Sequence, residues 1–208
     1  MSNALLESVV KKNRARLIPF MLALYVLAFL DRSNIGFAKE TYQLDTGLSN
    51  EAYALGAGIF FVVYAFLGVP ANLLMRKFGA RKWIGCTTLL WGLLSAAMAW
   101  ADTEAKFLLV RTLLGAAEAG FFPGMIYLTS QWFPQQNRAS IMGLFYMGAP
   151  LALTLGSPLS GALLEMHGFM GHPGWFWMFI IEGLLAVGAG FFTFFWLDDT
   201  PQKARFLS

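Results

Sequence analysis

The sequence predicts an all-α integral membrane protein, a bundle of six transmembrane helices. The chain is 57% hydrophobic and 13% charged, and its mean hydropathy is +0.57. An ordinary soluble domain has about 25% charged residues, so this composition excludes that class and makes lipid the expected surroundings. Six apolar segments each reach the roughly 20 helical residues that are needed to cross a hydrocarbon core.

The expected spans cover residues 17–38, 52–75, 83–101, 107–132, 139–164 and 175–197. They divide the chain into an amino-terminal segment (1–16), the bundle (17–197) and the start of a further loop (198–208). Basic residues precede the first span, as in a signal peptide. The span lacks a small-x-small cleavage site and is longer than a signal peptide, so we expect a retained helix.

Prolines interrupt three of these spans, at Pro70, Pro123, Pro150 and Pro158. In a membrane such interruptions survive only where a neighbouring helix or a cavity satisfies the freed backbone groups. Glycines lie near the prolines, and we expect most of them to let helices pack closely.

Basic residues lie mainly in the loops on one side of the predicted membrane. These are Lys11, Lys12, Arg14, Arg16, Arg76, Lys77, Arg81, Lys82, Arg138, Lys203 and Arg205, against Lys39 and Lys106 on the other side. The positive-inside rule therefore predicts a multi-pass protein of the inner (plasma) membrane with both termini in the cytoplasm. The net charge of +3 is explained by these loops and does not indicate nucleic-acid binding.

Ionisable residues occur within the spans, where a charge costs about 2.5–3.5 kcal/mol. They are Asp31, Arg32, Arg111, Glu118 and Glu182. Because Arg111, Gly115 and Glu118 are spaced i, i+4, i+7, they share one face of a helix, and we expect this face to point into the bundle or a hydrated cavity.

Two interpretations of these charges stay open from the residues alone. In the structural one, Asp31 and Arg32 lie near water at the outer end of the first span while Arg111 and Glu118 neutralise each other. In the functional one, an arginine binds a carboxylate ligand and Glu118 changes its protonation when that ligand is present. Tyr64 and Asn34 add hydrogen-bonding groups at similar depths. Glu182 is expected in a structural ion pair or in helix packing.

The residues for other chemistry are sparse. His167 and His172 lie in a loop and would need further ligands to hold a metal, so no metal site or cofactor is expected. No Ser–His pair lies within the spans and no glycine-rich phosphate loop follows a strand, so we do not expect an enzyme. Cys86 is the single cysteine and cannot form an internal disulfide.

Motifs in five of the six spans are similar to those of one transporter family. They are FLDRSNIGFA (29–38), PANLLMRKFGARKWIG (70–85), RTLLGAAEAGFFPGMIYLTSQWFPQQNRA (111–139), GSPLSGALL (156–164) and GWFWMFIIEGLLAV (174–187). In this order they resemble the amino-terminal half of the anion:cation symporter family of the major facilitator superfamily, and more narrowly its bacterial sugar-acid carriers of the rhamnonate and galactonate type.

This resemblance implies roles for single residues. Asp31 and Glu118 match the acids that couple a proton, and Arg32, Arg111 and Tyr64 match positions that bind substrate or hold those acids. We add Asn34 to the substrate-binding candidates.

The loop with Arg76, Lys77, Gly79 and Arg81 matches the superfamily's gating loop. The aspartate usual in that loop is missing, Asn72 replaces a glycine, and Phe176 stands where relatives often have arginine.

The resemblance also implies a 3+3 inverted repeat and a second six-helix half, because carriers of this family are roughly twice this length. We therefore expect the amino-terminal half of a proton-coupled symporter for an organic anion, such as an aldonate. The alternative is a non-transporting, truncated membrane module that assembles with another six-helix half.

Overall fold

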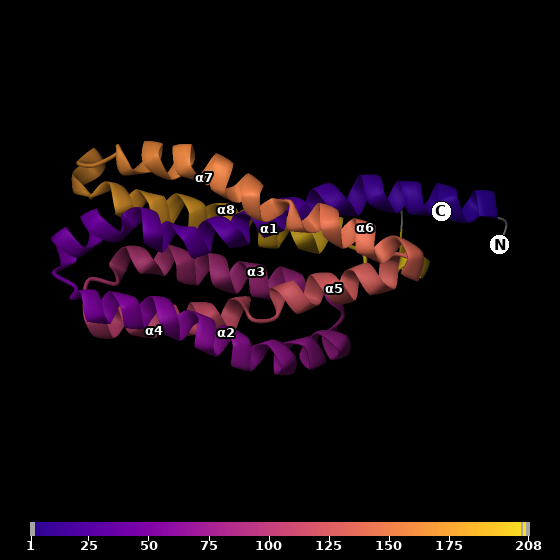
Figure 1. Ribbon diagram of the computed structural model, residues 1–208, viewed down its shortest axis with the longest axis horizontal. Helices are drawn as coiled ribbons and strands as arrows, with labels where there is room; N and C mark the ends of the chain where they lie inside the picture. The colour runs from indigo at the N-terminus through magenta and orange to yellow at the C-terminus, as the bar shows by residue number, and fades with distance from the viewer. Residues whose placement is uncertain (1–2, 205, 207–208) are drawn as a thin grey trace.

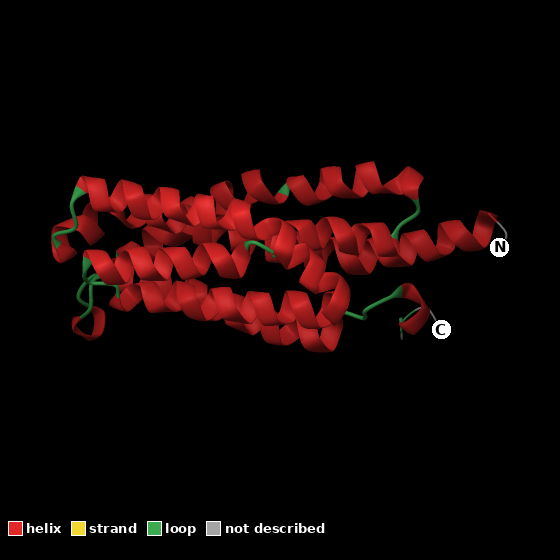
Figure 2. Cartoon of the chain, turned by 90° about the horizontal axis from the view of Figure 1, so that it is seen from below, coloured by secondary structure: helices red, strands yellow, loops and turns green. Residues whose placement is uncertain are grey.

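The computed structural model describes residues 3–204 and 206, and helices make up nearly all of this part of the chain (Figures 1 and 2). The α-helices are α1 (Asn3–Thr46), α2 (Asn50–Phe78), α3 (Ala80–Ala97), α4 (Glu104–Glu118), α5 (Phe121–Trp132), α6 (Gln135–Tyr146), α7 (Gly148–Leu164) and α8 (Gly174–Trp196). Short 3-10 helices are η1 (Met98–Trp100), η2 (Phe169–Gly171) and η3 (Pro201–Lys203). No strand occurs among the described residues, which confirms the all-α prediction. The cytoplasmic placement predicted for residues 1–2, Arg205 and 207–208 falls outside the described residues.

Within the described part of the chain, six helical segments are long and apolar enough to cross a membrane, which confirms the predicted number. They are Leu6–Thr46, Asn50–Phe78, Ala80–Trp100, Glu104–Trp132, Gln135–Leu164 and Gly174–Trp196, and each predicted span lies within its segment to within one residue. Helix α1 has 44 residues and continues through the expected boundary at residue 16. The position of the membrane surface along α1 therefore stays a prediction.

Among the described residues, two of the six crossings are interrupted helices, whereas α2 continues through Pro70 and α7 through Pro158. Helices α4 and α5 form the fourth crossing, and α6 and α7 form the fifth. Helices α5 and α7 each begin two residues before a proline, Pro123 and Pro150. A proline donates no backbone N–H and its ring clashes with the carbonyl four residues earlier, so α-helical bonding stops at both points. The first break leaves Glu118 at the very end of α4.

The helices lie roughly along one axis in an elongated bundle (Figure 1). Helix α3 packs against α8, α2 against α4, and α1 against both α7 and α8. Both chain ends lie at the same end of the bundle in the two views (Figures 1 and 2), as an even number of crossings requires.

Small residues let the most closely packed pair, α3 and α8, approach to backbone contact. A Cβ added at Gly183 would lie 2.5 Å from the backbone nitrogen of Ala96, and one at Gly92 would lie 2.6 Å from that of Val187. Lipid tails are as apolar as the helices, so close packing of this kind, rather than hydrophobic burial, holds membrane helices together.

Candidate functional site

The central feature of the site is an ion pair between α1 and α4. The Nε atom of Arg32 lies 2.7 Å from Oε2 of Glu118, and the Glu118 side chain is fully buried while that of Arg32 is 17% exposed. Asp31 and Arg32 lie within α1, far from both of its ends, and Glu118 is the last residue of α4. The structure thus brings together charges that are 86 residues apart in sequence.

Aromatic rings of α2 cover one side of this pair. Phe60 and Tyr64 are one turn apart and stack with ring centroids 6.1 Å apart. The guanidinium carbon of Arg32 lies 4.7 Å from the Tyr64 ring centroid and 5.9 Å from that of Phe60. An arginine within about 6 Å of an aromatic ring is attracted to its face. Tyr64 therefore lies beside Arg32.

Arg111 reaches the same aromatic cluster from α4. Its Nε donates to the backbone carbonyl of Gly56 at 3.1 Å, and its guanidinium carbon lies 4.5 Å from the Phe60 centroid. A Cβ on Gly115 would lie 2.4 Å from the carbonyl oxygen of Phe60. The face formed by Arg111, Gly115 and Glu118 therefore packs against α2 inside the bundle, as its spacing predicted. Glu118 forms its ion pair with Arg32, however, and not with Arg111.

Asp31 completes the charged cluster. The residue is 7% exposed, and its carboxyl group lies close to that of Glu118. Asp31 also acts electrostatically on Arg111. We call Asp31, Arg32, Arg111 and Glu118 the charged cluster; it contains two acids and two arginines, so its formal charges cancel when all four are ionised.

Asn34 lies one turn further along α1 but faces a different neighbour. It is fully buried, and its amide lies close to the carboxyl group of Glu182 in α8. The hydroxyl of Ser160 in α7 donates to Oε1 of Glu182 at 3.2 Å. Among the described residues, no cation forms an ion pair with Glu182, so the expected structural ion pair is not found there. Ser160 carries no signal in the sequence beyond a hydroxyl within an apolar segment.

The predicted gating loop lies where α2 meets α3. Arg76 and Lys77 are in the last turn of α2, and Gly79 alone joins the two helices with φ +86°. The Arg81 backbone N–H donates to Oδ1 of Asp199 at 3.1 Å, and a Cβ on Gly79 would lie 2.8 Å from the same oxygen. Asp199, which follows α8, thus supplies a carboxylate to a loop that lacks its usual aspartate. No pattern in the sequence predicts this contact.

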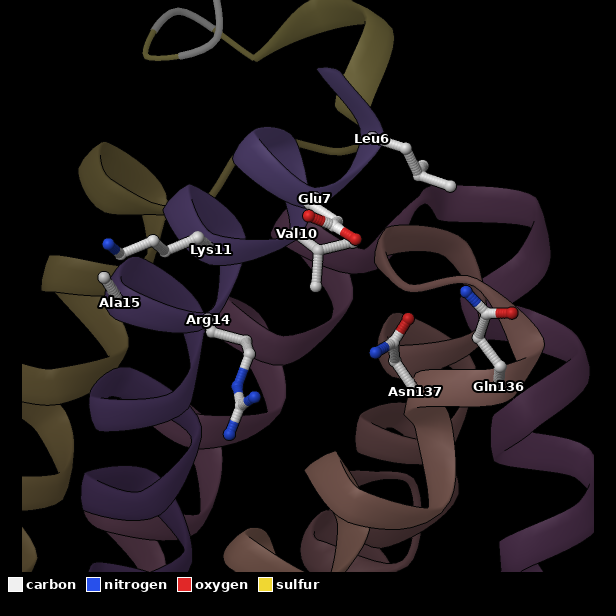
Figure 3. Close-up of a pocket in the computed structure, with 8 residues that line it drawn as sticks. All are labelled: Leu6, Glu7, Val10, Lys11, Arg14, Ala15, Gln136 and Asn137. Atoms are coloured by element: carbon white, nitrogen blue, oxygen red, sulfur yellow. The ribbon is translucent and has the colours of Figure 1, made fainter. Parts of the chain in front are cut away.

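One groove lies beside the charged cluster, and a separate pocket lies near the start of α1. A groove of about 410 Å³ runs along α2 and α5 from Tyr64, beside the charged cluster, to Arg76, next to the predicted gating loop. A separate pocket of about 510 Å³ lies between the first part of α1 and the start of α6. Figure 3 shows side chains of α1 on one side of this pocket and Gln136 and Asn137 on the other. The second pocket contains no residue of the predicted site.

The loop histidines do not form a metal-binding group. His167 and His172 line a small hollow with Asp45, and the His172 ring stacks on Phe176. Within the described part of the chain, no three His, Cys, Asp or Glu side chains are placed to hold a metal ion.

Comparison with known proteins identifies the family. The sequence pattern of the Major Facilitator Superfamily matches residues 21–208. The chain belongs to the Major Facilitator Superfamily. It is 92% identical over 208 residues to the inner membrane transport protein RhmT of Escherichia coli (strain K12). The matched region covers 100% of this chain and 48% of that protein. A protein of Agrobacterium vitis named for tartrate transport is 49% identical over 208 residues, with the same two coverages of 100% and 48%.

The superfamily fold is also shared with solved structures. The crystal structure of a bacterial homologue of the human lysosomal transporter Spinster, in an inward-facing and occupied conformation, matches with a TM-score of 0.83 at 20% identity. The match covers 90% of this chain and 45% of that one. This likeness shows the fold alone. The chain spans about half the length of the curated relatives that it matches, and the resemblance found from its motifs to this superfamily is confirmed.

Proposed function

We propose that the chain is the amino-terminal half of a proton-coupled symporter that moves an organic anion, such as an aldonate, across the inner membrane. The observation that carries this proposal is the buried pair of Arg32 and Glu118. A full ion pair inside a membrane bundle is costly to maintain, and such residues usually mark substrate or proton pathways. The proposal is therefore transport rather than catalysis.

The charge balance of the cluster supports the coupling of a proton to an anion. The formal charges of Asp31, Arg32, Arg111 and Glu118 cancel before any ligand binds. A bound carboxylate adds one negative charge in a region of low dielectric, where an uncompensated charge is strongly unfavourable. A proton on Glu118 or Asp31 restores neutrality, so anion and proton are expected to bind together. We assign proton coupling to these two acids.

Arg32 is the proposed receptor for the substrate carboxylate. Its Nε donates to Glu118, while its Nη2 atom is buried and has no hydrogen-bond partner among the described residues. When Glu118 takes a proton, its attraction for the guanidinium weakens and the planar fork of Arg32 becomes available to a carboxylate. Tyr64 lies beside the fork and Arg111 adds a second positive charge. Asn34 faces Glu182, so we do not include it among the residues that contact the substrate.

The substrate class follows from this receptor and from the relatives. A carboxylate satisfies Arg32, and hydroxyl groups can use the polar groups near it, such as Tyr64. An aldonate and tartrate share a carboxylate with a hydroxyl on the next carbon, and the A. vitis relative is named for tartrate. We therefore propose an α-hydroxy carboxylate as the common feature of the substrate.

Transport by this route requires a second half. Phe66 and Val69 on α2 are 78% and 72% exposed, on the helix that lines the groove from Tyr64 to Arg76. In alternating access, one repeat rocks against another around a site at their interface. We propose that the loop of Arg76, Lys77, Gly79 and Arg81 gates the cytoplasmic end of this interface, and that both termini are cytoplasmic. We call this chain joined to a second six-helix half the complete carrier.

Anion binding to purified complete carrier tests the proposal. We expect an aldonate such as rhamnonate to bind in calorimetric titrations, and the corresponding neutral sugar not to bind. Arg32→Gln removes a charge-assisted hydrogen bond and should weaken binding about 10- to 100-fold. Arg32→Lys keeps the charge but loses the fork and should also weaken binding. Lys106→Gln is the matched control, because it also removes a positive charge but from an exposed side chain. Unchanged aldonate affinity in Arg32→Gln would show that Arg32 is not the receptor.

A further inference from the structure

A second polar cluster lies beside α1, on the side of α7 and α8. It consists of Asn34, Ser160 and Glu182, and each of these residues is at most 5% exposed. Ser160 donates to Oε1 of Glu182, and the Asn34 amide lies close to the same carboxyl group. The Oε2 atom of Glu182 is buried and has no hydrogen-bond partner among the described residues. This cluster has no place in the substrate site described above.

No positive charge balances Glu182 in this cluster. Among the described residues, α7 contains no charged residue, and α8 contains none besides Glu182 itself. Helix α3 packs on α8, but its basic residues Arg81 and Lys82 lie in its first turn, whereas Gly183 contacts Ala96 near its last turn. Helix α1 contributes Asp31, which is also an acid. An ionised Glu182 would therefore be a buried charge with no cation partner on these helices, which is the arrangement that a bound proton relieves.

Asp31 belongs to the charged cluster and lies on the same helix as Asn34. Asn34, one turn along α1 from Asp31, faces Glu182. The same helix thus carries the acid that neighbours the substrate receptor and the amide that faces a third buried acid.

We propose that Glu182 is a proton-binding residue of the carrier. This inference rests on the proposed function. Proton binding forms one O–H bond on the Glu182 carboxylate and removes its negative charge, and release of the proton reverses both changes. Ser160 keeps its hydrogen bond to Glu182 in both states.

The protonation of Glu182 can be measured without transport. Infrared spectra of the complete carrier in lipid membranes at neutral pH contain a carbonyl band for each protonated carboxyl group, separate from the carboxylate bands. We expect the wild-type minus Glu182→Gln difference spectrum to show the loss of one such band. Ser160→Ala removes the hydrogen bond but not the acid, so it should shift this band without removing it. Loss of a carboxylate band instead, with the carbonyl bands unchanged, would overturn the proposal.

Transport separates a proton-binding role from a structural one. Glu182→Gln has the shape of the protonated acid and can still accept from Ser160, so a residue with only a packing role would tolerate it. We expect this variant to exchange labelled for unlabelled aldonate across the membrane, but to lose the dependence of uptake on pH. An unchanged pH profile in Glu182→Gln would overturn this inference while leaving the proposed symport intact. Absence of gradient-driven uptake in the wild type would refute symport itself, and the infrared result would still decide the protonation of Glu182.

Discussion

Removing the guanidinium of Arg32 would leave the Glu118 carboxylate buried without its ion-pair partner. The two side chains meet at 2.7 Å, and the Glu118 side chain is fully buried. At an effective dielectric constant of 20, two unit charges at this distance attract each other by about 6 kcal/mol. Desolvation of both groups offsets much of this attraction, and breaking a buried pair by removing one partner typically costs about 3–5 kcal/mol.

The double-mutant cycle of Arg32→Gln and Glu118→Gln measures this interaction. We expect Arg32→Gln alone to lower the free energy of unfolding by about 3–5 kcal/mol. Protonation of the stranded Glu118 carboxylate reduces this loss. Glu118→Gln in the Arg32→Gln background removes the stranded carboxylate and should restore most of the loss. The coupling energy between the two sites should therefore be about 2–4 kcal/mol, within the range found for contacting residues in one network or somewhat above it.

The assay is unfolding of the complete carrier, followed by tryptophan fluorescence during titration with a denaturing detergent. The exposed pair of Lys106 and Asp102 is the matched control, since its N–O distance is 2.6 Å but both side chains are more than half exposed. Exposed pairs of this kind contribute little to stability, so the same cycle there should give no measurable coupling. Additive effects of Arg32→Gln and Glu118→Gln would refute the view that the two charges depend on each other.

Two further predictions test the packing and the orientation of the bundle. Gly115→Ala places a Cβ 2.4 Å from the Phe60 carbonyl oxygen and should destabilise the carrier by about 1–3 kcal/mol, measured by thermal unfolding. Gly143→Ala, where a Cβ would meet nothing within 4 Å, should be neutral, and equal effects at both glycines would contradict the close α2–α4 contact. In a Cys86→Ser background, Gln136→Cys should react with an impermeant thiol reagent only from the cytoplasm, and Thr46→Cys only from outside. Labelling of Gln136→Cys from outside would reverse the proposed orientation.

The sequence predicts the number of crossings well because hydropathy over about 20 residues is a local property. The inward face of α4 is predictable for a similar reason, since the spacing of Arg111, Gly115 and Glu118 sets their direction from one helix. A face with two charges has few stable positions in a membrane other than the interior. Local periodicity is sufficient for both conclusions.

The partners across helices are not predictable in this way. Periodicity shows that Glu118 faces inward, but not that it meets Arg32 on α1 rather than Arg111 on its own helix. The direction of Asn34 depends on how α1 packs against α8, which no spacing within α1 reveals. Asp199 supplies its carboxylate to Arg81 from 118 residues away. Each of these contacts depends on the relative placement of distant segments.

The most direct test of the account is uptake of an aldonate by the complete carrier in proteoliposomes with an imposed pH gradient. A gradient of one pH unit stores about 1.4 kcal/mol per proton, so one proton per monovalent anion allows about tenfold accumulation. We predict accumulation toward this limit in the wild type, with the aldonate moving toward the alkaline side. Glu118→Gln should still exchange labelled for unlabelled aldonate but should not accumulate it. Accumulation in the wild type that ignores the pH gradient, or accumulation that persists unchanged in Glu118→Gln, would contradict the coupling of a proton to the anion through the charged cluster.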